Sequence, residues 1–334
     1  MAFEPRFCPH AACPSRSGLA PFAYRLRGHF QRRCDRRTVQ RLHCLACKRS
    51  FSVQNFRVDY RLKRPDLLAL FFTDRVSKVH HRQSARNHAC SRSTEERHFR
   101  RLSLHCEAFH QARLAEVTAR GGLGEVFLLD ELETYEQDRR KMPVTVPILI
   151  ERASGFVIDT RVGTLPARRR RRAALRRRLE AEGKLEDERK SESREVVKAA
   201  FERLRDVSPR DRPLYVHTDR KSSYVPLLKE LFGERCRHMR TSSRRRRNWT
   251  NPLGAINHTL ARVRSNVSRL VCRTWATAKL RRWLAGQLAI WVCYRNYLQG
   301  MTNEHRHTTP AMALGVQAQK LELPQLLEWR VFPC

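Results

Sequence analysis

The sequence predicts an α/β protein, and three observations support this fold class. Apolar runs with the length and composition of β-strands recur after residue 120. One helix pattern interrupts them, an order that an α/β fold explains. The first part of the chain instead has paired cysteines followed by helical patterns. The expected organisation is a cysteine-rich domain over 1–58, a helical domain over 59–120, an α/β core over 121–300 and a tail over 301–334.

The composition predicts a polyanionic partner. The chain has 334 residues, with 68 Lys and Arg against 33 Asp and Glu, and its formal net charge is +35. Nucleic acid is the first choice of partner, and an anionic membrane surface is the weaker alternative. The N-terminus lacks an apolar signal core, and no apolar stretch is long enough to span a bilayer. We therefore expect a cytoplasmic protein that binds nucleic acid and not a membrane.

Four of the 11 cysteines form two tight pairs. Four residues separate Cys8 from Cys13, and two separate Cys44 from Cys47. Without a secretion signal, clustered cysteines indicate a metal rather than disulfides. Two cysteine knuckles around a short β-rich segment are typical of a zinc ribbon, in which a tetrahedral Zn²⁺ fixes a domain that lacks a core of its own. Three nearby residues remain alternative ligands, namely Cys34, His10 and His43.

The region 59–120 has the pattern of several helices. Ser93 is the expected N-cap of its basic helix, with Glu96 as the capping-box partner. A short helix, a tight turn and a basic helix indicate a helix-turn-helix whose recognition helix contacts DNA. An ordinary helical hairpin is the alternative. The expected DNA contacts on the basic helix are Ser93, Thr94, Arg97, Arg100 and Arg101.

The core follows the glycine-rich segment 121–124, which we interpret as a hinge. Asp130 ends the first β-like run, and Asp219 follows a later one. Three runs, a helix over 193–204 and a fourth run are the order of a ribonuclease-H-like core, whose first and fourth strands are neighbours. Two carboxylates on neighbouring strands can hold Mg²⁺ for phosphoryl transfer. Either aspartate alone could instead start a turn. The expected strands cover 125–129, 144–150, 155–162 and 214–218.

Two segments of the core are strongly basic. Near 166–192 an Arg block precedes a Glu-rich stretch, which we interpret as a solvated helix or flexible insertion without assigned chemistry. The stretch 236–303 contains no Asp or Glu. A helix that begins near Asn251 and Pro252 should face the core with its apolar residues and DNA with its arginines. A merely solvated basic face is the alternative. The expected DNA contacts here are Arg245, Arg262, Arg264 and Arg269.

The chain resembles the DDE transposases of bacterial insertion sequences over nearly its full length. The resemblance implies that Asp130 and Asp219 are the first two catalytic acids. The third, a Glu on the following helix, falls at Asn257, so the sequence departs from the family pattern there. No other acid in that region can replace it. The resemblance rests on the ribbon cysteines, Ser93-Thr94, Leu129-Asp130-Glu131, His217-Thr218-Asp219, Arg262-Val263-Arg264, Ser268-Arg269-Leu270, Arg273-Thr274-Trp275 and the tail Thr309-Pro310-Ala311-Met312-Ala313-Leu314-Gly315.

This resemblance implies a DNA transposase that cleaves element ends and transfers the freed 3′-hydroxyl to target DNA. Asp130 and Asp219 would hold catalytic Mg²⁺ or Mn²⁺, and Asn257 or the adjacent His258 would complete the site. The ribbon and helix-turn-helix would bind terminal repeats of double-stranded DNA, with the protein a homodimer or higher oligomer in the bacterial nucleoid. A catalytically impaired, transposase-derived DNA-binding regulator is the alternative. An RNA-binding zinc protein is a third interpretation.

Overall fold

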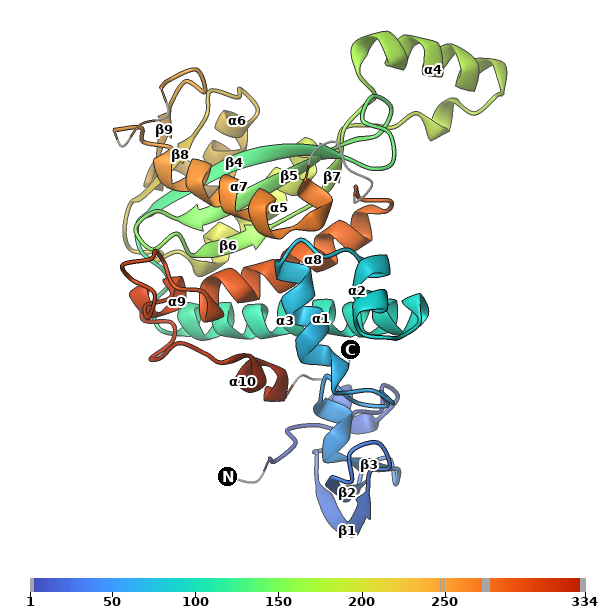
Figure 1. The fold of residues 1–334 in the computed structure, drawn as a ribbon. Helices are drawn as coiled ribbons and strands as arrows, with labels where there is room; N and C mark the ends of the chain where they lie inside the picture. Colours follow the sequence, from blue (N-terminus) through green and yellow to red (C-terminus); the bar gives the residue numbers. More distant parts are fainter. Residues whose placement is uncertain (1–2, 247, 249, 272–276, 331–334) are drawn as a thin grey trace.

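A mixed β-sheet forms the centre of the protein (Figure 1). The computed structural model describes residues 3–246, 248, 250–271 and 277–330. The strand order is β6-β5-β4-β8-β9, and β7 pairs with β5 at one edge. The α/β fold class is thus confirmed. The six strands are β4 (Val126–Tyr135), β5 (Pro143–Glu151), β6 (Val157–Thr160), β7 (Gly163–Thr164), β8 (Leu214–Thr218) and β9 (Cys236–Arg240).

The middle strand β4 joins the antiparallel and parallel parts of the sheet. It pairs with β5 in antiparallel register and with β8 in parallel register. β5 also pairs antiparallel with β6, and β8 pairs parallel with β9. Every residue of β5 is buried, because helices cover both faces of the sheet. All four predicted strands are present, but the first does not end at Asp130: β4 continues to Tyr135 because its pairing with β5 extends that far. The strand β9 was not predicted from its basic sequence.

Helices cover the two faces of the sheet, and the side chains of β4 alternate between them. Phe127 and Leu129 pack in one apolar cluster with α5 and α6. Leu128 and Leu132 pack in the other cluster with α7 and α8. This alternation follows from the two-residue period of a strand. The bounds are α5 (Ser193–Val207), α6 (Tyr224–Phe232), α7 (Gly254–Asn266) and α8 (Arg281–Cys293).

The helical region before the sheet shares the sheet's core. It comprises α1 (Leu67–Val76), α2 (His81–Asn87) and the long α3 (Arg92–Ala119), which packs along α8 and against α5. Phe99 and Phe109 of α3 are buried in the same cluster as Phe127 of the sheet. Close to the molecule's C-terminal end, the short α9 (Pro310–Ala313) and α10 (Leu323–Glu328) complete this cluster.

The N-terminus of α3 differs from the prediction. The Ser91 hydroxyl accepts a 3.1 Å hydrogen bond from the backbone N–H of Thr94, so Ser91 is the N-cap. Ser93 lies inside the first turn, and the prediction that it caps the helix is wrong. Both serines precede the same basic run of residues. Which of them caps α3 depends on where the turn between α2 and α3 ends, and the sequence alone does not show this.

The glycine-rich segment 121–124 forms a close-packed turn between α3 and β4. Gly122 has a φ of 92°, and a Cβ there would lie 2.7 Å from the Val207 carbonyl oxygen. The backbone N–H of Leu123 donates to the same carbonyl at 2.8 Å. Only glycine fits this approach of the chain to the end of α5.

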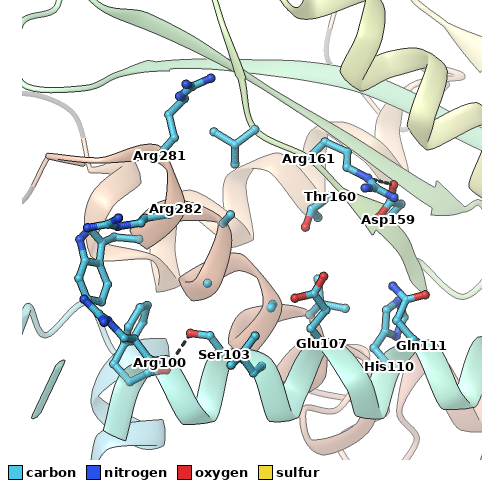
Figure 2. Close-up of a pocket in the computed structure, with 18 residues that line it drawn as sticks. Arg100, Ser103, Glu107, His110, Gln111, Asp159, Thr160, Arg161, Arg281 and Arg282 are labelled. Carbon is cyan, nitrogen blue, oxygen red and sulfur yellow. Dashed lines mark hydrogen bonds and ion pairs between the residues drawn. The ribbon is translucent and has the colours of Figure 1, made fainter. Parts of the chain in front are cut away.

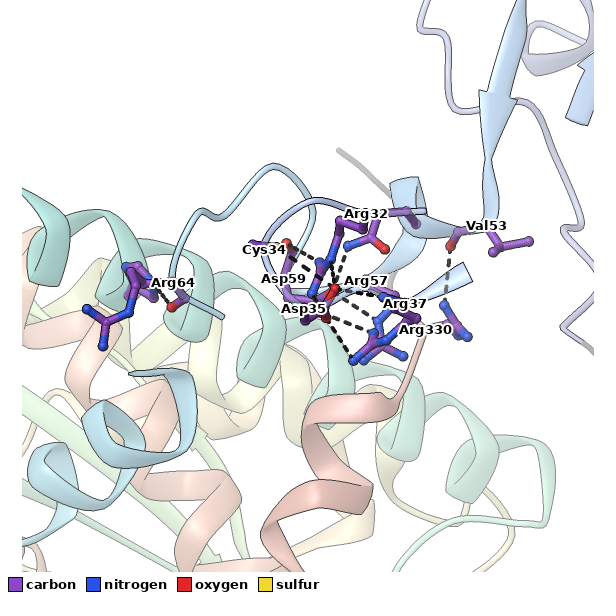
Figure 3. A network of polar contacts seen from close by, with 11 residues as sticks. Arg32, Cys34, Asp35, Arg37, Val53, Arg57, Asp59, Arg64 and Arg330 are labelled. Carbon is purple, nitrogen blue, oxygen red and sulfur yellow. Dashed lines mark hydrogen bonds and ion pairs between the residues drawn. The ribbon is translucent and has the colours of Figure 1, made fainter. Parts of the chain in front are cut away.

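The N-terminal domain is a small antiparallel sheet of β1 (Tyr24–Gln31), β2 (Thr38–Cys44) and β3 (Ser50–Ser52). Asp59, just after this domain, receives ion pairs from Arg32 at 3.1 Å, Arg37 at 3.3 Å and Arg57 at 2.9 Å (Figure 3). From the C-terminal segment, Arg330 donates to the Val53 carbonyl at 3.2 Å. These contacts fix the domain to the helical region.

Candidate metal centre and active site

Four cysteine thiols converge between the N-terminal loop and the β2–β3 turn. The sulfur atoms of Cys8, Cys13, Cys44 and Cys47 all lie within 4.8 Å of one another. Cys8 and Cys47 are 3.7 Å apart, and so are Cys13 and Cys44. A tetrahedral ion with Zn–S bonds of about 2.3 Å requires sulfur separations of about 3.8 Å. This predicted set of residues therefore fits a metal ion such as Zn²⁺.

The alternative ligands lie outside this cluster. Cys34 is exposed, and His10 is engaged with the Ser50 carbonyl at 3.2 Å. Burial raises the pKa of the Cys8 and Cys47 thiols, so without a cation both would stay protonated. Metal binding would replace those protons and link the domain's fold to the ion.

The second candidate site lies where β4 and β8 run side by side. Their parallel pairing extends to Leu128 opposite His217. Extending this register by two residues, past the end of β8, would place Asp130 opposite Asp219. Neighbouring strands are about 4.8 Å apart, so the two carboxylates fall within the span of one or two divalent cations. The backbone N–H of Lys221 donates to the Asp219 side chain at 3.0 Å and holds it in a turn.

Tyr224, at the start of α6, contacts Glu131, the residue after Asp130. Its buried hydroxyl donates to Glu131 at 2.6 Å. Burial raises the pKa of Tyr224, and the Glu131 carboxylate raises it further. The negative charges of Asp219 and Asp130 raise this pKa in the same direction. No pattern in the sequence signalled this tyrosine, because its role depends on a contact between α6 and β4.

Asp130 faces α7, the helix that carries Asn257. Its strand neighbours Leu128 and Leu132 pack with Ile256 on that helix, and alternate residues of a strand share a face. Glu131 points to the opposite face, where it meets α5 and α6. This separation of Asp130 from Glu131 follows from the alternation of side chains along a strand.

His258 is exposed and contacts Arg262 on the same helix. Arg262 donates to its Nε2 at 3.3 Å. Burial lowers the pKa of His258, and Arg262 and Arg295 lower it further. Arg262 also donates to the Met301 carbonyl at 2.6 Å. The side chains of adjacent helical residues point about 100° apart, so Asn257 and His258 point toward different neighbours.

A third carboxylate beside the aspartates is absent from the described residues. The four cysteines are the only group of three or more potential ligands within the parts of the chain that the structure describes. Among these residues no third acid therefore joins Asp130 and Asp219, and Asn257 remains the candidate for the third position.

The arginines predicted to bind DNA fall into three classes. Arg97, Arg100, Arg245 and Arg264 are exposed, whereas Arg101 and Arg262 are partly buried. Arg269 is buried, donates to Gln287 at 2.7 Å, and has its pKa lowered by burial to about 9. Its side chain faces the interior instead of the surface. Arg247, Trp249 and the Arg273-Thr274-Trp275 motif lie outside the described residues.

Arg100 lies on the rim of a basic groove between α3, α8 and the end of β6 (Figure 2). The groove has a volume of about 750 Å³. The guanidinium of Arg100 lies 5.1 Å from the Trp283 ring centre, and that of Arg282 lies 5.8 Å from it. The groove therefore combines an aromatic ring with cations that can meet phosphates.

Comparison with known proteins leaves the site's geometry as the main guide to function. No protein-family model matches the chain. No curated protein is significantly similar to it. Among the described helices, none has the length and apolar content needed to cross a membrane.

Proposed function

We propose that this chain is a metal-dependent DNA transposase with a ribonuclease-H-like core. The observation that carries the proposal is the parallel pairing of β4 and β8, whose register, extended by two residues, would place Asp130 opposite Asp219. The strand order β6-β5-β4-β8-β9 supports it, because the first and fourth core strands, β4 and β8, are neighbours. The charge of +35 and the exposed arginines near α7 suit a DNA substrate.

In this proposal Asp130 and Asp219 bind divalent cations, for which carboxylate oxygens are preferred ligands. Bound Mg²⁺ or Mn²⁺ would supply an activated nucleophile and neutralise charge on the phosphate. The Asn257 amide oxygen is the third ligand in this arrangement. Arg245 and Arg264 hold the DNA backbone by charge-assisted hydrogen bonds to phosphate oxygens.

The N-terminal half would recognise the element ends. A zinc-bound ribbon gives a rigid surface, and α2, a short turn and α3 have the order of a helix-turn-helix. Ser93, Arg97 and Arg100 are exposed and recur along one face of α3, as a recognition helix requires. Recombination joins two ends, so we expect a homodimer or higher oligomer on DNA.

Nicking of a supercoiled plasmid that carries the DNA flanking the gene tests the proposal. We expect Mg²⁺- or Mn²⁺-dependent nicking by the wild type. Asp130→Asn and Asp219→Asn should each reduce it by about 100-fold or more, since each removes a metal-binding charge. Asp211→Asn is the matched control, because that side chain is 79% exposed at the opposite end of β8. Wild-type levels of nicking by either active-site variant would refute the assignment.

A second candidate is a DNA-binding regulator that has lost catalysis. Asn257 favours it, because an amide brings no charge to a metal site and the described residues supply no third acid. This candidate predicts tight binding to the element ends together with no nicking in either metal. Transposition activity of the wild type would exclude it.

A further inference from the structure

The helix α4 (Arg169–Ala181) stands apart from the body of the protein (Figure 1). Its sequence is RRRRAALRRRLEA, and none of its described side chains is buried. Arg, Ala and Leu are strong helix formers, but an isolated helix of this length is marginal in water. Ion pairs of Arg172 with Glu188 at 2.9 Å and of Arg178 with Glu182 at 2.7 Å hold it together.

The base of this arm is tied to the β4–β5 hairpin. On the outgoing side, Arg168 pairs with Glu133 of β4 at 3.7 Å. On the returning side, Arg189 pairs with the buried carboxylate of Glu136 at 2.8 Å and donates to the Pro143 carbonyl at 3.1 Å. These contacts on both sides set where the arm leaves the sheet.

The arm begins near the carboxylate pair. Glu133 follows Asp130 by three residues on β4, a distance of about 10 Å along a strand. Asp219 follows the last residue of β8, whereas Asp130 lies in the middle of β4 and the arm is tied to the carboxyl end of that strand. A helix of 13 residues is about 20 Å long, which corresponds to about six base pairs of duplex DNA.

The arm carries charge that the protein does not neutralise. Arg171, Arg176 and Arg177 are exposed and make no salt bridge within the described residues. On α4 itself, Leu175 and Leu179 are only half-exposed, and Leu185 in the returning segment is 39% exposed, which is less apolar surface than a membrane-surface helix would need. A regular row of phosphates, as in duplex DNA, would neutralise these positive charges.

We propose that α4 is a clamp that grips the backbone of duplex DNA beside the Asp130–Asp219 pair. This inference rests on the proposed function and adds the surface that holds the duplex flanking the reacting phosphate. Arg171, Arg176 and Arg177 contact phosphates and carry no sequence preference.

Fluorescence anisotropy with a random-sequence 30-base-pair DNA, titrated at several KCl concentrations, tests the clamp. Each phosphate contact contributes about 0.9 to the slope of log affinity against log salt. The triple variant Arg171→Gln/Arg176→Gln/Arg177→Gln should make the slope shallower by about 2 to 3. Gln keeps nearly the same helix propensity as Arg, and the Lys triple variant, which keeps the charge, should restore the slope.

A matched control variant removes three positive charges from a different part of the surface. Arg205, Arg210 and Arg212 lie at the opposite end of β8 and are exposed, so their triple Gln variant should leave the slope within about one contact of wild type. Equal losses in both triple variants, or no loss in the α4 variant, would overturn the clamp. If the α4 variant loses affinity only for an RNA duplex of equal length, the arm binds RNA, and the clamp proposal is overturned as well. Wild-type plasmid nicking, measured in parallel, separates failure of the clamp from failure of the proposed function.

Discussion

Tyr224 on α6 donates a 2.6 Å hydrogen bond to Glu131, the residue that follows Asp130 on β4. The same carboxylate accepts hydrogen bonds from Thr145 at 2.7 Å and from Ser193 at 2.8 Å, and it pairs with Lys221. Glu131 thus connects the sheet to α5 and to the segment after β8. Because that segment begins with Asp219, the network positions one aspartate relative to the other.

Replacing Glu131 should loosen this arrangement. Glu131→Ala leaves buried donors without a partner, and we expect a loss of about 2–3 kcal/mol in the free energy of unfolding by urea. Affinity for Mn²⁺, measured by calorimetry, should fall as well, whereas Glu131→Gln should recover part of both. The control is Glu133→Ala, since that side chain is 65% exposed. An unchanged Mn²⁺ affinity in Glu131→Ala would show that Glu131 has no positioning role.

Removing one zinc ligand should unfold the N-terminal domain. Cys44→Ser leaves three thiolates, and a small domain of this kind folds on metal binding. We expect elemental analysis to find one Zn²⁺ per wild-type chain and far less in the variant, with proteolysis of residues 1–58. Cys34→Ser, outside the cluster, should keep its zinc. Wild-type protein without zinc would contradict the prediction.

Restoring an acid at position 257 should strengthen the metal site. Asn257→Glu adds a negative charge on the helix that packs over Asp130, so Mg²⁺-dependent nicking should stay level or rise. Asn257→Ala should reduce nicking more than His258→Ala, because Arg262 engages His258. The reverse order in the plasmid assay would move the third ligand to His258. A variant that gains activity over an inert wild type would establish the regulator.

His110 should make the protein sensitive to acid. Its Nε2 lies 3.0 Å from the Ile158 carbonyl, and its Nδ1 lies 2.9 Å from the Tyr297 hydroxyl, a pattern that suits the neutral ring. Burial lowers the pKa of His110 to about 4, from an ordinary value of 6.5. The folded state is therefore fully stabilised above pH 6.5 and loses about 3 kcal/mol as the pH falls to 4.

Urea unfolding at pH 7 and pH 4 measures this effect. In His110→Gln the difference in unfolding free energy between the two pH values should shrink by that amount, whatever the variant's stability at pH 7. His29→Gln, at an exposed position of β1, should keep the wild-type difference. Identical pH dependence in wild type and His110→Gln would contradict the assignment.

Much of the fold could be predicted because its signals are local. Apolar runs such as 144–150 become strands when both sides are buried, and the spacing of Cys8, Cys13, Cys44 and Cys47 fits one ion. The aspartates were found for the same reason, since each follows an apolar run. The sequence alone therefore determined the α/β class, the cysteine cluster and the candidate carboxylates.

Tertiary structure decided what depends on residues far apart in the chain. The position of the α2–α3 turn made Ser91 the N-cap, and packing against Gln287 buried Arg269. The hydrogen-bond partners of Glu131 come from β5, α5 and the segment after β8, so no local sequence pattern predicted them. Burial and hydrogen bonding are properties of the folded surroundings, and those surroundings form only when distant segments pack together.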